Sequence, residues 1–225
     1  MRALVVKPHE LSATRFVGER LRERGVELVD HIASRDGPPP SLDGFDAVVV
    51  MGAPWSVYGL EVEPWIGGVL ETLREADGRN VPVLGVCFGA QALAEALGGH
   101  VRPAGTTELG WREVQTDDPL FVPPGPWFMW HSDTFDLPAG AHEIARSPAS
   151  PQAFTVGPHL CVQFHLEVDA DLVASWLDHD ASDFLDAGMD PEAVLEETRR
   201  REDEARERAG ALVDRFLEGA RARPG

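Results

Sequence analysis

Short apolar runs alternate with amphipathic stretches through the first part of the chain. Turn residues bound these runs, which is typical of buried strands. The runs lie at 3–6, 26–29, 47–51 and 81–86. The stretches at 12–24 and 64–76 place apolar residues at helical spacing. Strands that alternate with helices predict an α/β fold in which a mostly parallel sheet is covered on both faces.

The pattern changes after residue 100. Short β-like pieces, punctuated by Pro and Gly, predict hairpins or an antiparallel section of the sheet. These pieces lie at 108–115, 127–130, 143–146, 153–156 and 160–164. From residue 169 the pattern is helical to the end. We therefore expect one domain over 1–225, made of a core (1–180) and a C-terminal helical extension (181–225).

The last predicted helix, over 192–217, is strongly charged. Its acidic and basic residues form i,i+4 pairs with the acid first, which is the orientation that stabilises a helix better. Leu212, Val213, Phe216 and Leu217 add an apolar stripe near its end. This predicts a solvated helix whose last turns dock on the domain, and a helix that binds a partner is the alternative.

Charge and composition exclude several classes of protein. The chain has 225 residues and a formal net charge of −18, which argues against nucleic acid and anionic membranes as partners. No apolar run reaches the length of a membrane span, and Lys7, Pro8 and His9 interrupt the apolar N-terminus too early for a signal peptide. Cys87 and Cys161 are the only cysteines, so we expect no disulfide framework and a reducing, cytoplasmic location.

The most specific local motif is G-V-C-F-G at 85–89. It follows the apolar run 81–84 and precedes a helical segment at 90–97 that stops at two glycines. A nucleophile in a sharp turn between a strand and a helix is a nucleophile elbow, here with Cys87 in place of serine. The turn is tight, so its neighbours must be small. The helix N-terminus behind Cys87 favours the thiolate, which is the nucleophilic form.

A cysteine nucleophile needs a base, and the base needs an orienting group. His165 and Glu167 lie in Q-F-H-L-E, just after an apolar strand. Residues two apart in an extended segment point to the same side, so Glu167 can fix the tautomer of the His165 ring. Cys87 is distant in sequence, and only the fold can bring it to this pair.

Together, G-V-C-F-G-A-Q at 85–91 and Q-F-H-L-E at 163–167 resemble the class I glutamine amidotransferase family. The resemblance extends from Met1 to about Val168 and implies a doubly wound, flavodoxin-like sheet that carries a Cys-His-Glu triad. The glutaminase of guanylate synthesis is the nearest likeness, and a stand-alone member is an alternative.

The resemblance implies roles for further residues. M-G-A-P at 51–54 is similar to the family's Gly-Gly-Pro loop, which implies that Ala53 and Phe88 donate the oxyanion N–H groups and that Gly52 belongs to the substrate site. W-H-S-D at 130–133 resembles the loop that contacts the ends of glutamine, which implies substrate contacts by His131, Ser132 and Asp133. Gln91 matches a substrate-contacting glutamine.

The sequence departs from the family pattern at three positions. Ala53 replaces a usual glycine, and a positive φ there would be strained. Leu166 replaces a common proline between the His and the Glu. Ser132 stands where glycine is frequent. None of these changes removes a catalytic side chain.

Other candidate residues have simpler interpretations. Cys161, inside an apolar strand, is expected to be inert. His159, Cys161 and His165 alternate along one strand, but no carboxylate or C-x-x-C completes a site, so we expect no metal and no cofactor. The remaining histidines are expected on the surface or in packing, whereas His131 could be structural. Trp55 and Tyr58 could line an entrance or pack.

The expected reaction is hydrolysis of a γ-glutamyl amide through a Cys87 thioester, with release of ammonia and glutamate. The sequence contains no phosphate-binding loop and no S-G-G-x-D-S motif, so a separate synthetase subunit is the expected acceptor of ammonia. A stand-alone hydrolase of larger γ-glutamyl amides or peptides is the first alternative. A non-catalytic binding protein on the same fold is the second.

Overall fold

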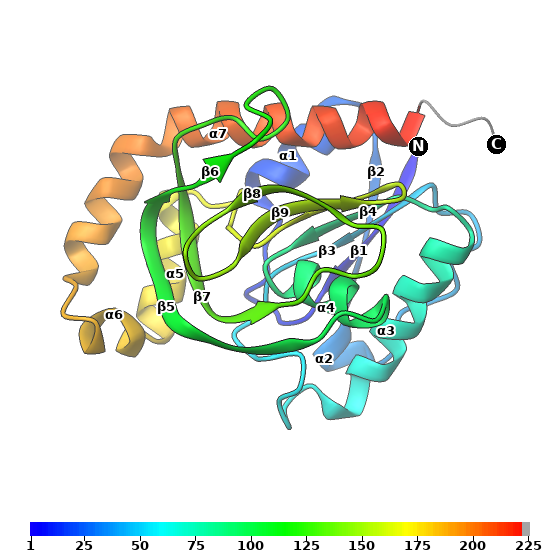
Figure 1. Ribbon diagram of the computed structural model, residues 1–225, viewed down its shortest axis with the longest axis horizontal. Coiled ribbons are helices and arrows are strands. Elements are labelled where there is room, and N and C mark those ends of the chain that lie inside the picture. Colours follow the sequence, from blue (N-terminus) through cyan, green and yellow to red (C-terminus); the bar gives the residue numbers. More distant parts are fainter. Residues whose placement is uncertain (222–225) are drawn as a thin grey trace.

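A computed structural model describes residues 1–221 of the chain, and Figure 1 shows the arrangement of its elements. The strands are β1 (Arg2–Lys7), β2 (Glu27–Ile32), β3 (Ala47–Val50), β4 (Val83–Val86), β5 (Val101–Glu113), β6 (Gln115–Thr116), β7 (Pro126–Phe135), β8 (His142–Arg146), β9 (Pro151–Val156) and β10 (His159–Val162). The helices are α1 (Arg15–Glu23), α2 (Ala33–Asp36), α3 (Glu63–Gly78), α4 (Phe88–Ala96), α5 (Ala170–His179), α6 (Ser182–Asp186) and α7 (Pro191–Arg221).

The main sheet has the order β2-β1-β3-β4-β10-β9-β8-β6. The strands from β2 to β10 in this order pair in parallel, whereas β9, β8 and β6 continue the sheet antiparallel. The parallel part has the doubly wound, flavodoxin-like order, with β10 in the fifth place. The predicted α/β class and the antiparallel section after residue 100 are therefore confirmed.

The sheet separates two apolar cores, because successive side chains of a strand point to opposite faces. In β1, Ala3 and Val5 join the core under α1 and α7. Leu4 and Val6 join the core under α3 and α4. Figure 1 shows α1 and α7 along one side of the sheet and α3 and α4 along the other. The continuous apolar runs of the sequence thus reflect strands that are buried on both faces.

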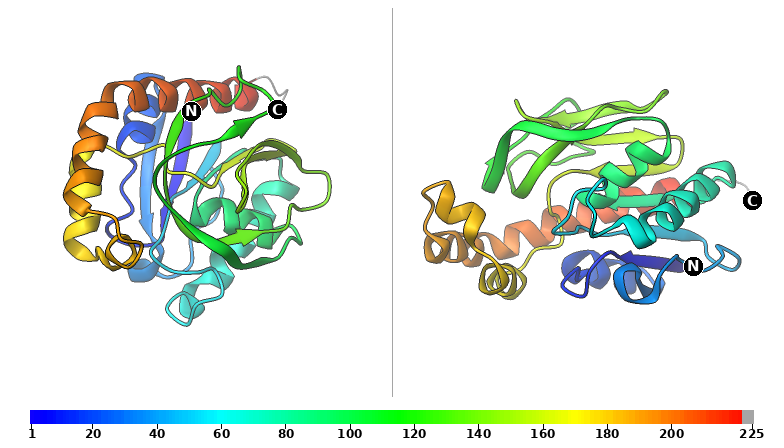
Figure 2. Two further views of the ribbon diagram at one scale, coloured as in Figure 1. Left: turned by 60° about the vertical axis from the view of Figure 1, so that its left-hand side comes forward. Right: turned by 90° about the horizontal axis from the view of Figure 1, so that it is seen from below.

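A second, two-stranded sheet pairs β5 with β7. Figure 2 shows this ribbon at the far end of the molecule from β1 and β2. The sequence predicted pieces at 108–115 and 127–130, but the strands are longer and run over Val101–Glu113 and Pro126–Phe135. One consequence is that His131, Ser132 and Asp133 lie on a strand, not in the loop that the resemblance implied.

Other boundaries also differ from the sequence-based expectation. The helix predicted at 12–24 begins at Arg15, and the short helix α2 follows β2, where the sequence analysis predicted no helix. Helix α4 begins at Phe88, directly after the elbow, and not at residue 90. Ends of helices depend on local hydrogen bonding, which the apolar pattern does not encode.

Helix α7 docks on the domain along its length and not only through the last turns that the sequence predicted, because Val194, Thr198 and Ala205 are also buried. Leu212, Val213 and Phe216 are buried in the core under α1. At the rim of this contact, the guanidinium groups of Arg20 and Arg24 both bind Asp214, with closest N–O distances of 2.6 Å. This packing agrees with the apolar stripe of the sequence.

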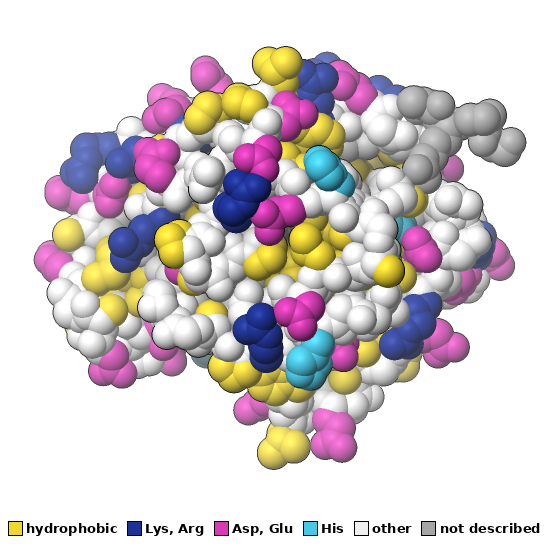
Figure 3. Space-filling view, viewed as in Figure 1, with side chains coloured by type: hydrophobic (Ala, Val, Ile, Leu, Met, Phe, Trp, Pro, Cys, Tyr) yellow, Lys and Arg dark blue, Asp and Glu magenta, His cyan; other side chains and the backbone are white. Residues whose placement is uncertain are grey.

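The surface of the domain carries mixed charge. On the face drawn in Figure 3, acidic side chains alternate with basic ones, and no broad basic patch appears there. Among the described residues, no helix is both long enough and apolar enough to cross a membrane.

The turn between β4 and α4 is held by very close backbone contacts. A Cβ on Gly89 would lie 2.1 Å from the carbonyl oxygen of Val50, and a Cβ on Gly85 would lie 2.8 Å from the backbone of Gly89. Neither contact is sterically possible, so both glycines are required if α4 is to start against the end of β3. Cys87 itself has φ 50° and ψ −106°, a strained conformation for a residue with a side chain.

We predict that Gly89→Ala destabilises the fold by roughly 2 kcal/mol or more, because the added methyl group forces α4 away from β3. The matched control is Gly67→Ala in α3, where an added Cβ meets nothing within 4 Å. That variant is expected to be neutral or slightly more stable, because alanine is the better helix former. Urea unfolding measures both, and equal free energies of unfolding for the two variants would contradict the prediction.

Candidate active site

Cys87 lies where the carboxyl ends of β3, β4 and β10 meet. It follows β4, the central strand that pairs with both β3 and β10. Its backbone N–H donates to the carbonyl of Val162 at the end of β10 (2.8 Å). The carboxyl ends of parallel strands meet at one edge of a sheet, which is where ligands bind in such folds.

The pairing of β4 with β10 brings His165 to Cys87. Val86 and Val162 are opposite each other, so the chain that leaves β10 passes beside the elbow. The backbone N–H of His165 donates to the carbonyl of Phe128 in β7 (2.8 Å), which fixes the turn. A Cβ on Gly52 would lie 2.9 Å from Cε1 of His165 and 3.6 Å from Cβ of Cys87. Gly52 therefore lies against both side chains.

His165 and Glu167 form a buried pair. The Nδ1 atom of His165 lies 2.8 Å from Oε1 of Glu167, and the two residues are 6 % and 1 % exposed. The ring of Trp176 packs edge-on to the imidazole with a centroid distance of 5.0 Å. Oε2 of Glu167 is buried and has no hydrogen-bond partner among the described residues. The Glu167 side chain therefore makes its hydrogen bond to His165 through Oε1 alone.

The electrostatics of the pair favour a protonated imidazole. Burial by itself lowers the pKa of His165, but the carboxylate of Glu167 and the sulfur of Cys87 outweigh burial and raise the pKa well above 6.5. A hydrogen bond from Nδ1 to Glu167 leaves Nε2 as the ring nitrogen that can exchange a proton elsewhere.

Two amide side chains support Cys87. Nε2 of Gln163 donates to Sγ of Cys87 (3.5 Å), and Oε1 of Gln163 accepts from Nε2 of Gln91 (3.1 Å). The sequence prediction placed Gln91 in the site but assigned no role to Gln163. Its position, directly after β10 and two residues before His165, was the available signal.

A cavity of about 210 Å³ opens over Cys87. Its wall combines the chain after β1, the loop after β3, the elbow, β7, the His165 segment and the helices α5 and α6. The lining residues are His9, Leu11, Ser12, Gly52, Ala53, Pro54, Trp55, Ser56, Cys87, Gln91, Trp130, His131, Ser132, Asp133, His165, Glu167, Trp176, His179, Asp180 and Asp183.

All the predicted site residues except Phe88 line this cavity. The side chain of Phe88 is fully buried in the core under α3. Its backbone N–H belongs to the first turn of α4, where N–H groups have no intrahelical acceptor. Ala53 is not among the described non-glycine residues with positive φ, so alanine replaces the usual glycine without backbone strain.

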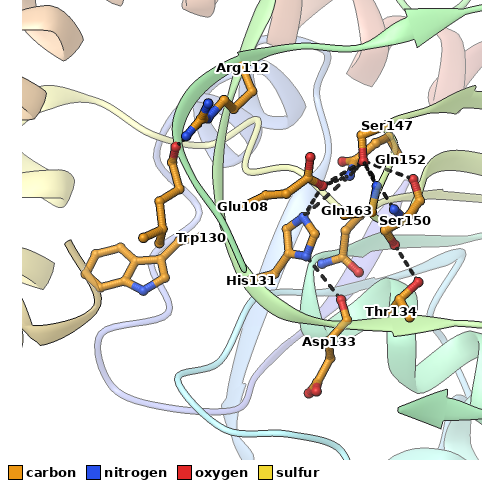
Figure 4. A network of polar contacts seen from close by, with 12 residues as sticks. Glu108, Arg112, Trp130, His131, Asp133, Thr134, Ser147, Ser150, Gln152 and Gln163 are labelled. Atoms are coloured by element: carbon orange, nitrogen blue, oxygen red, sulfur yellow. Dashed lines mark hydrogen bonds and ion pairs between the residues drawn. The ribbon is translucent and has the colours of Figure 1, made fainter. Parts of the chain in front are cut away.

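His131 lines the cavity, but its ring is engaged in a buried polar network (Figure 4). Nε2 lies 3.2 Å from Oε2 of Glu108, and Nδ1 lies 3.1 Å from the carbonyl oxygen of Asp133. Burial raises the pKa of Glu108, but hydrogen bonds from His131 and Ser147 outweigh burial and lower it. Figure 4 also shows the side chains of Trp130 and Asp133 turned away from this network.

Several lining residues were not predicted from the sequence as parts of a site. His9 and His179 were expected on the surface or in packing, yet both line the cavity. Trp176 and Asp183 come from the helical region that the sequence described least. No local motif marks these residues, because the folding of α5 and α6 beside the elbow places them there.

The candidate metal ligands on β10 are used otherwise. Nδ1 of His159 accepts from the backbone N–H of Val83 (3.1 Å), and its Nε2 lies 3.2 Å from Asp77. Cys161 is fully buried, and burial raises the pKa of its thiol. Within residues 1–221, the structure shows no group of three or more His, Cys, Asp or Glu side chains that could hold a metal ion.

Comparison with known proteins agrees with this arrangement. The family model described as "Glutamine amidotransferase class-I" matches residues 6–175. The chain belongs to the class I glutamine amidotransferase family. The family resemblance that the sequence motifs suggested is thereby confirmed.

The relatives of this family member include glutamine-hydrolyzing GMP synthases. The enzyme of Phenylobacterium zucineum is 35% identical over 169 residues, which is 69% of this chain and 31% of the relative. That of Thermosipho melanesiensis is 33% identical over 178 residues, 75% of this chain and 33% of the relative. The chain thus spans about a third of their length. A crystal structure of a glutamine amidotransferase from Thermotoga maritima is 26% identical, with a TM-score of 0.88 over 97% of this chain and 98% of that chain.

We predict that Glu167→Gln lowers the pKa of His165, because it removes the carboxylate that most strongly raises it. NMR titration of the His165 ring measures this change. A raised pKa in the folded state makes protonated His165 stabilising below about pH 6.5, and this contribution is lost as pH rises through the folded-state pKa. The stability difference between wild type and variant should therefore shrink with rising pH, and a difference that grows with pH would contradict this.

Proposed function

We propose that the chain hydrolyses the side-chain amide of glutamine, or of another γ-glutamyl amide, through a thioester on Cys87. The observation that supports this most is the convergence of a strained elbow cysteine and a buried His–Glu pair at one cavity. The proposed catalytic residues are Cys87, His165 and Glu167. A nucleophilic thiol needs a reducing compartment, so we also infer a cytoplasmic location.

The reaction proceeds in two halves. The thiolate of Cys87 attacks the amide carbon and forms a tetrahedral intermediate. Protonated His165 then gives its proton to the departing nitrogen, and the C–N bond breaks. Ammonia departs, and the γ-glutamyl group stays on Cys87 as a thioester. Neutral His165 next takes a proton from water, whose oxygen attacks the thioester carbon. The C–S bond breaks, and glutamate and the free thiol result. Glu167 orients the imidazole in both halves.

The negative oxygen of the tetrahedral intermediate needs donors in place before the attack. We propose the backbone N–H groups of Ala53, in the loop after β3, and of Phe88, directly after Cys87. A donor of this kind contributes about 3 kcal/mol to transition-state stabilisation. Alanine at position 53 can serve, because the donor is backbone and its φ is unstrained.

The glutamyl part is proposed to lie between Gly52, Gln91 and the strand segment His131–Ser132–Asp133. Ser132 is exposed, so its hydroxyl and backbone are available to the substrate. The engaged ring of His131 shapes the strand behind it. No Lys or Arg lines the cavity in the described chain. An α-carboxylate would therefore depend on neutral donors, whereas acidic residues such as Asp133 suit an α-ammonium group.

The proposal includes two candidate functions, which differ in the group that leaves. The first is release of ammonia from glutamine; the relatives are glutamine-hydrolyzing GMP synthases, which suggests a separate synthetase subunit as the acceptor of the ammonia. The second candidate function is hydrolysis of a larger γ-glutamyl amide. It is favoured by the cavity wall of α5 and α6, where Trp176, His179 and Asp183 extend the space around Cys87.

Substitution of the nucleophile tests the chemistry. Cys87→Ser and Cys87→Ala should abolish ammonia release from glutamine. A diazoketone analogue of glutamine should label Cys87 in the wild type, and glutamine should protect it. Cys161→Ala is the matched control, because that thiol is fully buried in β10, and it should retain both activity and labelling. Wild-type ammonia release by Cys87→Ala would contradict the thioester mechanism, whereas an absence of both turnover and selective labelling in the wild type would indicate a binding protein.

The leaving amine can be tested with amides of equal length. We expect γ-glutamyl n-butylamide (neutral) and γ-glutamyl-4-aminobutylamide (cationic) to be cleaved at least about tenfold faster than γ-glutamyl-4-aminobutyrate (anionic), because Asp180 and Asp183 line the cavity and no Lys or Arg of the described chain does. Measurement of kcat/KM for the purified chain, with glutamine as reference, decides between the candidates. Turnover of glutamine alone would remove the second candidate function.

A further inference from the structure

The carboxylate of Asp133 binds the loop that follows β3. Its Oδ2 accepts a hydrogen bond from Oγ of Ser56 (2.5 Å), and its Oδ1 accepts one from the hydroxyl of Tyr58 (2.7 Å). Asp133 is 7 % exposed and lies on β7, far from this loop in sequence. The contact therefore ties the strand that carries His131 and Ser132 to the segment that carries Ala53.

The two hydrogen bonds to the Asp133 carboxylate are of a strong type and fix the positions of the Ser56 and Tyr58 hydroxyls. Hydrogen bonds to an ionised acceptor are short and stronger than bonds between neutral groups. Burial and the bond to Asp133 both raise the pKa of Tyr58, so its hydroxyl keeps the proton that it donates. Among residues 1–221, no ion pair to Asp133 is present within 4.0 Å, and the two hydroxyls supply its observed donors. Without these two hydrogen bonds, nothing would offset the free-energy cost of removing the Asp133 carboxylate from water.

The loop, residues 51–62, is also held at other points: the N–H of Met51 donates to the carbonyl of Val6 (3.0 Å), and the ring of Trp55 packs against His9 and Trp65. At its start, the carbonyl of Gly52 accepts from Oγ of Ser12 (2.7 Å). Further on, Val57 is buried in the core under α3. Ala53 lies between these anchors and is only partly buried. The hydroxyls of Ser56 and Tyr58 add side-chain hydrogen bonds to Asp133 that hold the part of the loop after Ala53 against β7.

We propose that Asp133 is a positioning residue that holds this loop, through Ser56 and Tyr58, with the Ala53 N–H aimed at the oxyanion. The inference rests on the proposed function and adds a connection between the substrate-facing strand β7 and the donor on the opposite wall. A carboxylate offers about four acceptor sites, so Asp133 can hold both hydroxyls and still face a substrate ammonium group.

Two single-hydroxyl deletions test this while the carboxylate of Asp133 stays in place; Ser56 lines the cavity, whereas Tyr58 lies outside its lining. Tyr58→Phe removes one donor from a ring that is 53 % exposed, and Ser56→Ala removes the other, so neither should unfold the chain. Each should lower kcat for glutamine about tenfold with KM changed less than about twofold. The double variant should approach the roughly 10²-fold cost of losing an oxyanion donor. Leu60→Ala, at the exposed tip of the same loop, is the control and should keep wild-type kinetics.

A second measurement separates positioning from a general structural role. Alkylation of Cys87 by iodoacetamide needs the thiol and His165 but no oxyanion donor, so its rate should stay within about twofold in both variants. Amide hydrogen exchange of Ala53, Trp55 and Ser56 should become faster. Asp133→Asn should resemble the double variant in kcat.

The outcomes distinguish the inference from the function on which it rests. Turnover that is lost in Cys87→Ser but unchanged in Ser56→Ala and Tyr58→Phe overturns the positioning role and leaves the proposed function standing. A fall in alkylation rate that parallels the fall in kcat also overturns it, because the defect then lies in the thiol pair. If wild type and Cys87→Ser release ammonia equally, the proposed function fails, and the inference fails with it.

Discussion

The close approach of helix α4 to the end of β3 is the contact on which the site depends. Gly89 lies against the carbonyl of Val50 at a distance that excludes any side chain. This approach starts the helix directly after Cys87 and forces the cysteine into a positive-φ conformation. The same contact places the N–H of Phe88 beside the loop that leaves β3. Nucleophile and candidate oxyanion donors therefore share one backbone constraint.

The order of the strands supplies the rest of the constellation. β10 follows the antiparallel strands β8 and β9 in the sequence and pairs with β4. His165 is therefore far from Cys87 in sequence but next to it in space. Burial then gives the His165–Glu167 contact its strength, because a carboxylate that is shielded from water interacts strongly with an imidazolium. The cost of burying these charges is offset by their mutual contact.

The cavity combines two kinds of wall. The sheet edge provides rigid backbone, as expected where strands end, whereas α5 and α6 provide Trp176, His179 and Asp183. Its lining is acidic and aromatic, and no Lys or Arg of the described chain belongs to it. The network of Glu108, His131 and Gln152 lies behind β7 and keeps that strand in place. The edge of the sheet thus positions Cys87, His165 and Glu167, and α5 and α6 complete the wall of the cavity.

The sequence by itself determined the α/β class, the elbow, and the local pairing of His165 with Glu167, because apolar periodicity, small residues in a tight turn and near neighbours are local properties. It also carried the family motifs on which the membership rests. Only the tertiary structure decided that Gln163 supports the thiol, that the ring of His131 faces Glu108, and that Asp133 binds Ser56 and Tyr58. These contacts join residues far apart in the chain. Strand order and the long β5–β7 ribbon set them, and neither is encoded in a short sequence pattern.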